Sequence, residues 1–160
     1  MRTSVLLTVL AVALAAGTAC AGPDDQDADI DNTVGIARAS NVVPIPADTS
    51  ARATVAFNVA SLQYGYTIES APPGTIDSIA LYQVAAGTVL PANATAILCA
   101  GAAACAASSG TATLVGAATS NSIRTSIRAY GTQVVIFTTA TAATRASGAI
   151  RGTMYPNPQD

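Results

Sequence analysis

The stretch of sequence that decides the fold is residues 52–68, RATVAFNVASLQYGYTI. Apolar residues occupy every second position from Val55 to Val59 and again from Leu62 to Ile68. Alternation with a period of two is typical of β-strands that bury one face. Because only two residues separate the two halves, we expect them to form an antiparallel hairpin.

Other segments carry the same signal. Residues 76–84 are apolar on both faces, which predicts a central strand. Residues 111–115, 133–139 and 149–155 add three strands, and residues 33–39 add an edge strand. The chain also contains 20 threonines, a residue type enriched in strands. The predicted fold is therefore all-β, an antiparallel β-sandwich or a flattened Greek-key barrel with one short helix.

The helix is predicted over residues 121–131, where Ile123, Ile127 and Tyr130 recur at helical spacing. Ser120 or Asn121 caps its start and Gly131 its end. Arg124 and Arg128 then lie one turn apart, a spacing that suits either a bound anion or a solvated helix face, and we expect them to face solvent.

Residues 1–20 are typical of a secretory signal peptide, with one arginine, about a dozen apolar or small residues and a small-residue end. Two processing sites compete. Residues 17–20, GTAC, resemble a bacterial lipobox in which Cys20 is acylated, although Gly17 stands where leucine is usual. The A-x-A pattern at residues 19–21 would instead release a protein that starts at Gly22. Either way we expect an extracytoplasmic protein, anchored to the membrane by lipid or secreted.

Residues 21–32 contain five aspartates and predict a flexible acidic spacer. Alternate aspartates from Asp25 to Asp31 also permit a calcium loop, but the expected glycine and closing glutamate are missing.

Removing or lipidating Cys20 leaves an even pair, Cys99 and Cys105, around a stretch rich in alanine. In an oxidising compartment this spacing predicts a disulfide that closes a small loop. A redox-active pair is the alternative, but the motif is not C-x-x-C, and no basic neighbour is present to lower a thiol pKa.

Missing residue types exclude most enzyme chemistry. The chain has no histidine and no tryptophan, and all seven basic residues are arginines. Histidine-dependent triads, His-ligated zinc, Schiff bases and P-loop lysines are therefore excluded. The formal charge of −2 does not suit nucleic acid. We expect no cofactor, no metal and no catalytic residue. The alternatives are a calcium-binding domain and a hydrolase that relies on carboxylates alone, such as Glu69 and Asp77.

Several stretches together resemble the CHRD domain, a module described in chordin and also found in exported bacterial proteins. They are residues 53–57, 64–68, 76–82, 132–139 and 148–154. The family typically ends in G-E-I-R-G, and here GAIRG at residues 148–152 differs only at Ala149. The resemblance implies an antiparallel β-sandwich or flattened barrel outside the cytoplasm.

The departures from that family concern histidine. Family members usually carry H-I-H where this chain has Ala80, Leu81 and Tyr82, and another histidine where it has Phe137. The resemblance therefore transfers no active site.

Arg151 is the residue of most interest in the last strand. Ile150, Gly152 and Met154 share one face, and Arg151 lies on the other. It is either a cation that faces a ligand or a structural residue paired with Asp77, Glu69 or backbone carbonyls.

The chain is thus predicted to be an exported, non-catalytic β module of the cell envelope or extracellular space that binds an unidentified partner or builds surface structure. The predicted divisions are a signal peptide over residues 1–20, the spacer over 21–32, a CHRD-like domain over 33–155 and a tail over 156–160.

Overall fold

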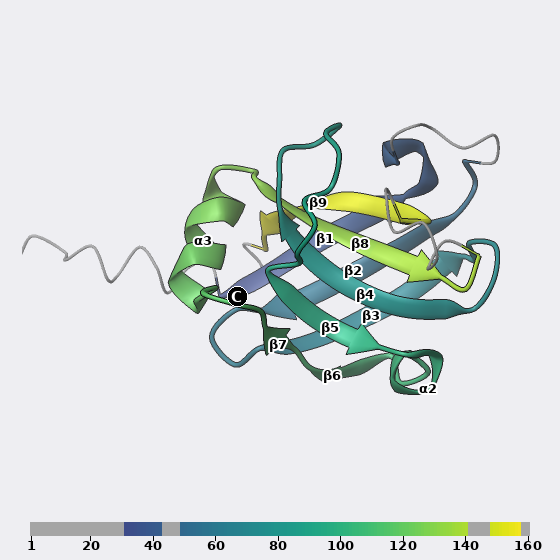
Figure 1. Ribbon diagram of the computed structural model, residues 1–160, viewed down its shortest axis with the longest axis horizontal. Helices are drawn as coiled ribbons and strands as arrows, with labels where there is room; N and C mark the ends of the chain where they lie inside the picture. The colour runs from purple at the N-terminus through teal and green to yellow at the C-terminus, as the bar shows by residue number, and fades with distance from the viewer. Residues whose placement is uncertain (1–30, 43–48, 141–147, 158–160) are drawn as a thin grey trace, which may run out of the picture.

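The computed structural model describes residues 31–42, 49–140 and 148–157, and every structural statement below refers to these residues (Figure 1). They form one antiparallel sheet of nine strands, with the spatial order β6-β3-β2-β1-β9-β8-β4-β5-β7. The strands are β1 (Asn32–Arg38), β2 (Arg52–Asn58), β3 (Gln63–Ser70), β4 (Ile76–Gln83), β5 (Ala96–Ala100), β6 (Ser109–Thr111), β7 (Thr113–Leu114), β8 (Thr132–Thr138) and β9 (Ile150–Pro156). The helical segments are η1 (Ala39–Asn41), α2 (Ala102–Cys105) and α3 (Ser120–Arg128).

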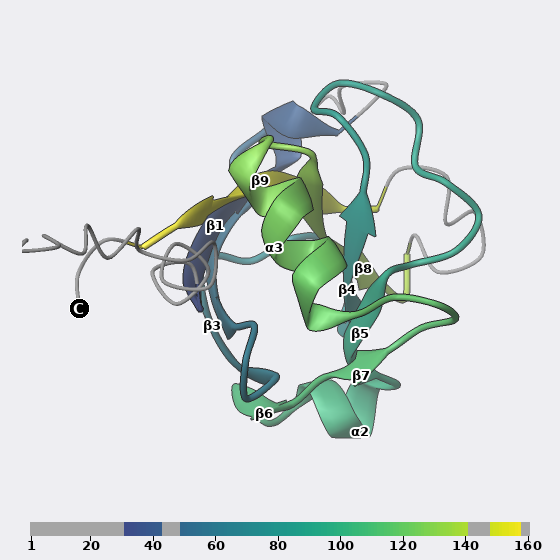
Figure 2. The same ribbon diagram turned by 90° about the vertical axis from the view of Figure 1, so that its left-hand side faces the viewer.

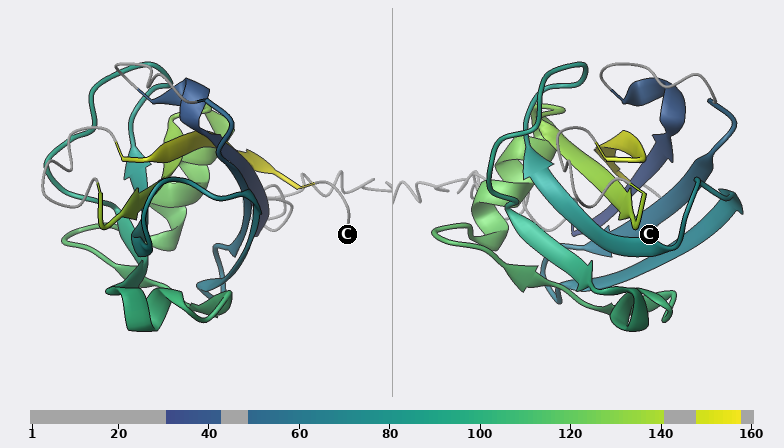
Figure 3. Two further views of the ribbon diagram at one scale, coloured as in Figure 1. Left: turned by 90° about the vertical axis from the view of Figure 1, so that its right-hand side faces the viewer. Right: turned by 45° about the vertical axis from the view of Figure 1, so that its right-hand side comes forward.

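The two edges of this sheet are joined by one short segment of chain. β6 pairs with β3 at one edge and β7 pairs with β5 at the other, and only Ala112 separates β6 from β7. The Ala112 N–H bonds to the Leu62 carbonyl at 2.8 Å, and the Val115 N–H bonds to the Thr95 carbonyl at 2.9 Å. The sheet therefore curls into a nearly closed barrel (Figure 3), which confirms the predicted all-β fold.

The interior of the barrel is the apolar face that the alternating pattern predicts. Val55, Phe57 and Val59 on β2 and just after it are almost completely buried, as are Ile150 and Met154 on β9. α3 lies across one end of the barrel (Figure 2) and adds Ile123 and Ile127, both fully buried in the same core.

One predicted detail of the strands is wrong, and the structure contains elements that the sequence did not predict. The first strand is not an edge strand, because β1 lies between β2 and β9. β9 comes from the far end of the chain, so local pattern carries no sign of this pairing. The structure also contains β5 and α2, which were not predicted. β5 has only five residues and α2 only four in an alanine-rich stretch, so neither gives a periodic pattern long enough to detect.

The helix begins one residue earlier than predicted. Its N-cap is Thr119, whose side chain accepts a hydrogen bond from the Ser122 N–H while the Ser122 side chain accepts from the Thr119 N–H. The helix ends at Arg128, and Tyr130 takes a left-handed conformation with φ 54°. Its ring is therefore exposed and does not continue the buried stripe.

In the part of the chain described here, no helix is long and apolar enough to cross a membrane.

Candidate binding site on the outer face

Arg151 projects from β9 to the outside of the barrel, on the face opposite Ile150 and Met154, as the strand period predicts. It is nevertheless fully buried, with 0% of its surface exposed. Its Nη1 donates to the Thr88 carbonyl at 2.7 Å, in the loop between β4 and β5. Its backbone carbonyl accepts a hydrogen bond from Asn41 Nδ2 at 3.0 Å, at the end of η1.

The rest of the guanidinium is unpaired among the described residues. Neither Nε nor Nη2 has a hydrogen-bond partner there, and no described carboxylate forms an ion pair with Arg151. Of the carboxylates considered from the sequence, Glu69 binds Arg52 at 2.8 Å and Thr54 at 2.6 Å. Asp77 lies on β4, which β8 separates from β9. Among the described residues, the backbone carbonyl of Thr88 is the hydrogen-bond partner of the Arg151 side chain.

Burial has an energetic consequence at this position. Desolvation lowers the pKa of the Arg151 guanidinium, although an arginine stays charged at physiological pH. Removing a charge from water without a counter-ion costs several kcal/mol. An anion near Arg151 would therefore recover part of that cost.

Arg38 on β1 is the direct cross-strand neighbour of Arg151 on β9. On its other side, Arg38 pairs in register with Arg52 on β2. Three arginines therefore cross the outer face in one row, and Arg52 is the member with a described carboxylate partner. The row brings Arg38 and Arg151 side by side in backbone register, and neither has a described carboxylate partner.

A pocket of about 620 Å³ opens on the outer face beside Arg38. It is adjacent to Arg151 through Asn41, which bonds the Arg151 carbonyl, and through Gly87, which precedes Thr88. The described residues that line it are Val34, Ile36, Arg38, Ser40, Asn41, Val42, Ala86, Gly87, Gln133, Thr153 and Tyr155. Its volume lies in the range of small-molecule sites. We call this cavity the Arg38 pocket.

A second feature of the outer face concerns the positions at which the CHRD resemblance places histidine. Ala80, Tyr82 and Phe137 come from β4 and β8 and pack together with Val135 in a small buried apolar cluster. The Tyr82 and Phe137 rings meet edge to face, with centroids 6.3 Å apart. Phe137 of β8 thus lies beside two alternate positions of β4, Ala80 and Tyr82, but these side chains offer no imidazole to a metal.

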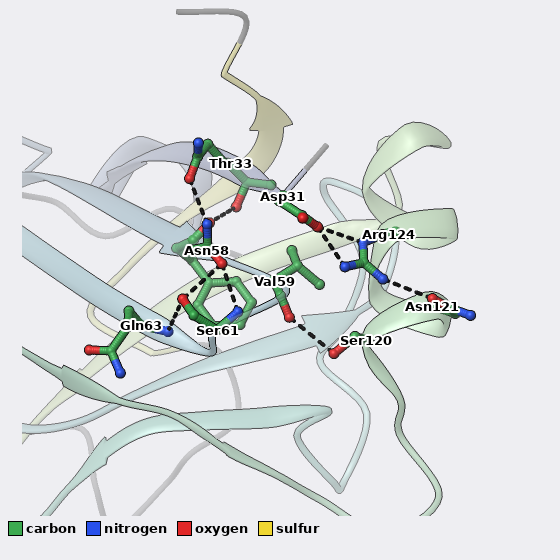
Figure 4. A network of polar contacts seen from close by, with 11 residues as sticks. Asp31, Thr33, Asn58, Val59, Ser61, Gln63, Ser120, Asn121 and Arg124 are labelled. Carbon is green, nitrogen blue, oxygen red and sulfur yellow. Dashed lines mark hydrogen bonds and ion pairs between the residues drawn. The ribbon is translucent and has the colours of Figure 1, made fainter. Parts of the chain in front are cut away.

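A polar network joins the start of β1, the β2–β3 hairpin and α3 (Figure 4). Asn58 Oδ1 accepts hydrogen bonds from the backbone and the hydroxyl of Ser61, and Ser120 Oγ donates to the Val59 carbonyl at 3.0 Å. Arg124 binds Asp31 rather than facing solvent as predicted. These groups bond to one another, so the network connects α3 to the start of β1 and to the β2–β3 hairpin.

Cys99 and Cys105 form a disulfide with their Cα atoms 5.3 Å apart, linking β5 to α2. Within the described ranges, no three His, Cys, Asp or Glu residues gather closely enough to hold a metal ion. Cys20 and the aspartates before Asp31 lie outside the described residues, as do residues 1–30 in general. Asp31 itself, the last residue but one of the predicted spacer, is part of the folded structure.

No protein-family model matches the chain, and neither a curated protein nor a solved structure matches it. The CHRD resemblance therefore stays a prediction. Sequence reasoning identified Arg151 but missed Arg38 and the pocket beside it, because their proximity depends on the β1–β9 pairing. The available signal was the alternation in residues 34–38, which places Val34, Ile36 and Arg38 on one face.

Proposed function

We propose that this protein is an exported, non-catalytic β-barrel module of the cell envelope or extracellular space that binds an anionic group at its outer face. The observation that carries the proposal is the Arg38–Arg151 pair, two neighbouring cations without a described carboxylate, one of them fully buried.

Export is supported by the signal-like residues 1–20 and by the cysteine pair, since disulfides persist in oxidising compartments. The lipobox-like residues 17–20 support an acyl anchor at Cys20, and residues 19–21 support free secretion.

Membership of the CHRD family is supported by the convergence of Ala80, Tyr82 and Phe137 at one place. Positions that share a role in relatives would have to lie together in the fold, and these three do.

A non-catalytic role is supported by the chemistry of the chain. It has no histidine or lysine, and the Cys99–Cys105 pair is bonded. Glu69 is engaged by Arg52 and Thr54 and lies on β3, which is not a neighbour of β4 with Asp77.

Export is tested by the intact mass of the protein from membrane and medium fractions of an expressing bacterium. We expect either a membrane-bound chain that starts at Cys20 with added acyl mass or a soluble chain that starts at Gly22. A full-length chain found only inside the cell would contradict export.

Anion binding is tested by thermal unfolding in acetate or phosphate at constant ionic strength, with chloride as the reference. We expect acetate or phosphate to raise the Tm of the wild type and the effect to be lost in Arg38→Gln. Arg52→Gln is the matched control, because it removes an arginine from the same row that already has Glu69. Equal Tm values in all three salts would contradict the binding proposal.

A further inference from the structure

We propose that the Arg38 pocket takes a small amphipathic anion, a molecule with one anionic head group and an apolar body of moderate length. This inference rests on the proposed anion binding and adds the chemical class of the ligand. It follows from how charge and apolar surface are ordered along β1 and β9.

The two strands carry the same gradient on their outer faces. Along β1 the outward positions are Val34, Ile36 and Arg38, in that order. β9 runs antiparallel, so that Tyr155 lies opposite Val34 and Arg151 lies opposite Arg38. Along β1 the pocket lining thus changes from apolar to cationic. β9 adds Tyr155 at the apolar end, and Arg151 lies buried behind the cationic end without lining the pocket.

The length of the gradient sets the size of the ligand. Val34 and Arg38 are four residues apart on an extended strand, which corresponds to about 13 Å. A single inorganic anion would cover the cationic end alone. A linear molecule with a short alkyl or aromatic body would cover both ends.

The apolar end is open to a ligand. Ile36 is 39% exposed, and Tyr155, whose ring also contacts Tyr130 with centroids 5.6 Å apart, is 48% exposed. Both line the pocket together with Val34. Covering this surface would remove apolar area from water, which favours binding.

Arg38 and Arg151 have different roles at the cationic end. Arg38 is exposed and lines the pocket, so it makes the direct contact with the head group. Arg151 is buried one strand away, where its charge is less screened by solvent, and it adds attraction without direct contact. A neutral apolar ligand would fill the pocket but leave both charges unpaired.

The experiment compares four probes on the full chain by isothermal titration calorimetry, all below their micelle concentrations. Octanoate and octyl phosphate carry head and body, acetate carries the head alone, and octanol carries the body alone. We expect octanoate or octyl phosphate to bind at least tenfold more tightly than acetate and octanol. Whichever of the two binds more tightly distinguishes a carboxylate ligand from a phosphate ligand, and either result supports the proposal.

Variants separate the two ends of the pocket. Ile36→Asn should reduce octanoate affinity to that of acetate while leaving acetate binding intact. Arg38→Gln should remove binding of both, whereas Arg52→Gln should remove neither.

Two results overturn the inference in different ways. Acetate binding equal to octanoate binding would leave the proposed anion binding in place and refute an amphipathic ligand. Octanol binding equal to octanoate binding, or no binding of any probe, would refute both. Because the probe series uses the wild-type protein, it decides the question even if a variant fails to fold.

Discussion

Arg124 of α3 donates hydrogen bonds from Nε at 2.8 Å and from Nη2 at 2.6 Å to a single carboxylate oxygen of Asp31 (Figure 4). Asp31 directly precedes β1, and α3 closes one end of the barrel. The contact therefore links α3 to the beginning of β1. With 14% and 28% of their side chains exposed, the two residues are better shielded from solvent than the Arg52–Glu69 pair, at 42% and 37%.

This difference in exposure predicts a difference in coupling energy. A double-mutant cycle with Asp31→Asn and Arg124→Gln should give a coupling of about 1 kcal/mol, measured by urea unfolding. The same cycle with Arg52→Gln and Glu69→Gln should give about half of that or less, because solvent screens an exposed pair. Equal couplings in the two cycles would show that burial of the Asp31–Arg124 pair has no effect.

Asp31 also shows where sequence reasoning stops. A run of aspartates predicts a solvated spacer, and nothing local distinguishes the last of them from the others. Its partner Arg124 lies 93 residues away, on a helix face predicted to meet solvent. The helix itself was predictable, because Ile123 and Ile127 form a local pattern and both are buried. The ion pair is a property of the tertiary fold alone.

The disulfide should stabilise the barrel by a moderate amount. Cys99 and Cys105 are six positions apart, and closing so short a loop is expected to contribute roughly 2 kcal/mol. A Cys99→Ala/Cys105→Ala variant should lose about that much free energy of unfolding. A reductant should destabilise the wild type to a similar extent and leave the double variant unchanged. If the reductant has no effect on the wild type, the bridge does not contribute to stability.

Tyr66 connects β3 to the loop that this disulfide closes. Its hydroxyl donates a hydrogen bond to the Cys105 carbonyl, and its backbone N–H bonds to the Ser108 carbonyl at 2.8 Å. Burial raises the pKa of the Tyr66 phenol above 10.0, and the nearby Tyr64 adds to the shift. The unfolded chain therefore releases this proton at a lower pH than the folded protein does.

The sign of this shift predicts a loss of stability in alkali. Below about pH 10 the phenol is neutral in both states, and the contribution of Tyr66 is fully present. It is lost as the pH rises through the higher pKa of the folded state. Tyr66→Phe should cost about 1 kcal/mol at neutral pH, from the lost hydrogen bond, and should make the alkaline decline shallower. The measurement is the Tm between pH 7 and 11, with the exposed Tyr155→Phe as the control that should follow the wild type.

The candidate site was predictable in part. The alternation in β9 placed Arg151 on the face opposite Ile150 and Met154, and the structure agrees. Its burial was not predictable, because its described hydrogen-bond partners, Thr88 and Asn41, belong to two segments far from it in sequence. An arginine on the outside of a strand is ordinarily solvated and needs no carboxylate. Because the fold buries Arg151, its lack of a described carboxylate partner leaves a buried charge uncompensated.

The last prediction separates a structural Arg151 from one retained for binding. An arginine that holds the fold together should cost several kcal/mol to replace. Arg151 has a single described side-chain partner, the Thr88 carbonyl, and its charge is buried without compensation from a described carboxylate. Arg151→Met keeps much of the side-chain volume and removes the buried charge.

We therefore expect Arg151→Met to leave the free energy of unfolding unchanged or to raise it by about 1 kcal/mol, while weakening octanoate binding at the Arg38 pocket. Urea unfolding and calorimetry on the same sample give both quantities. A loss of more than about 2 kcal/mol would identify Arg151 as a structural residue, and octanoate binding equal to that of the wild type would show that the pocket depends on Arg38 alone.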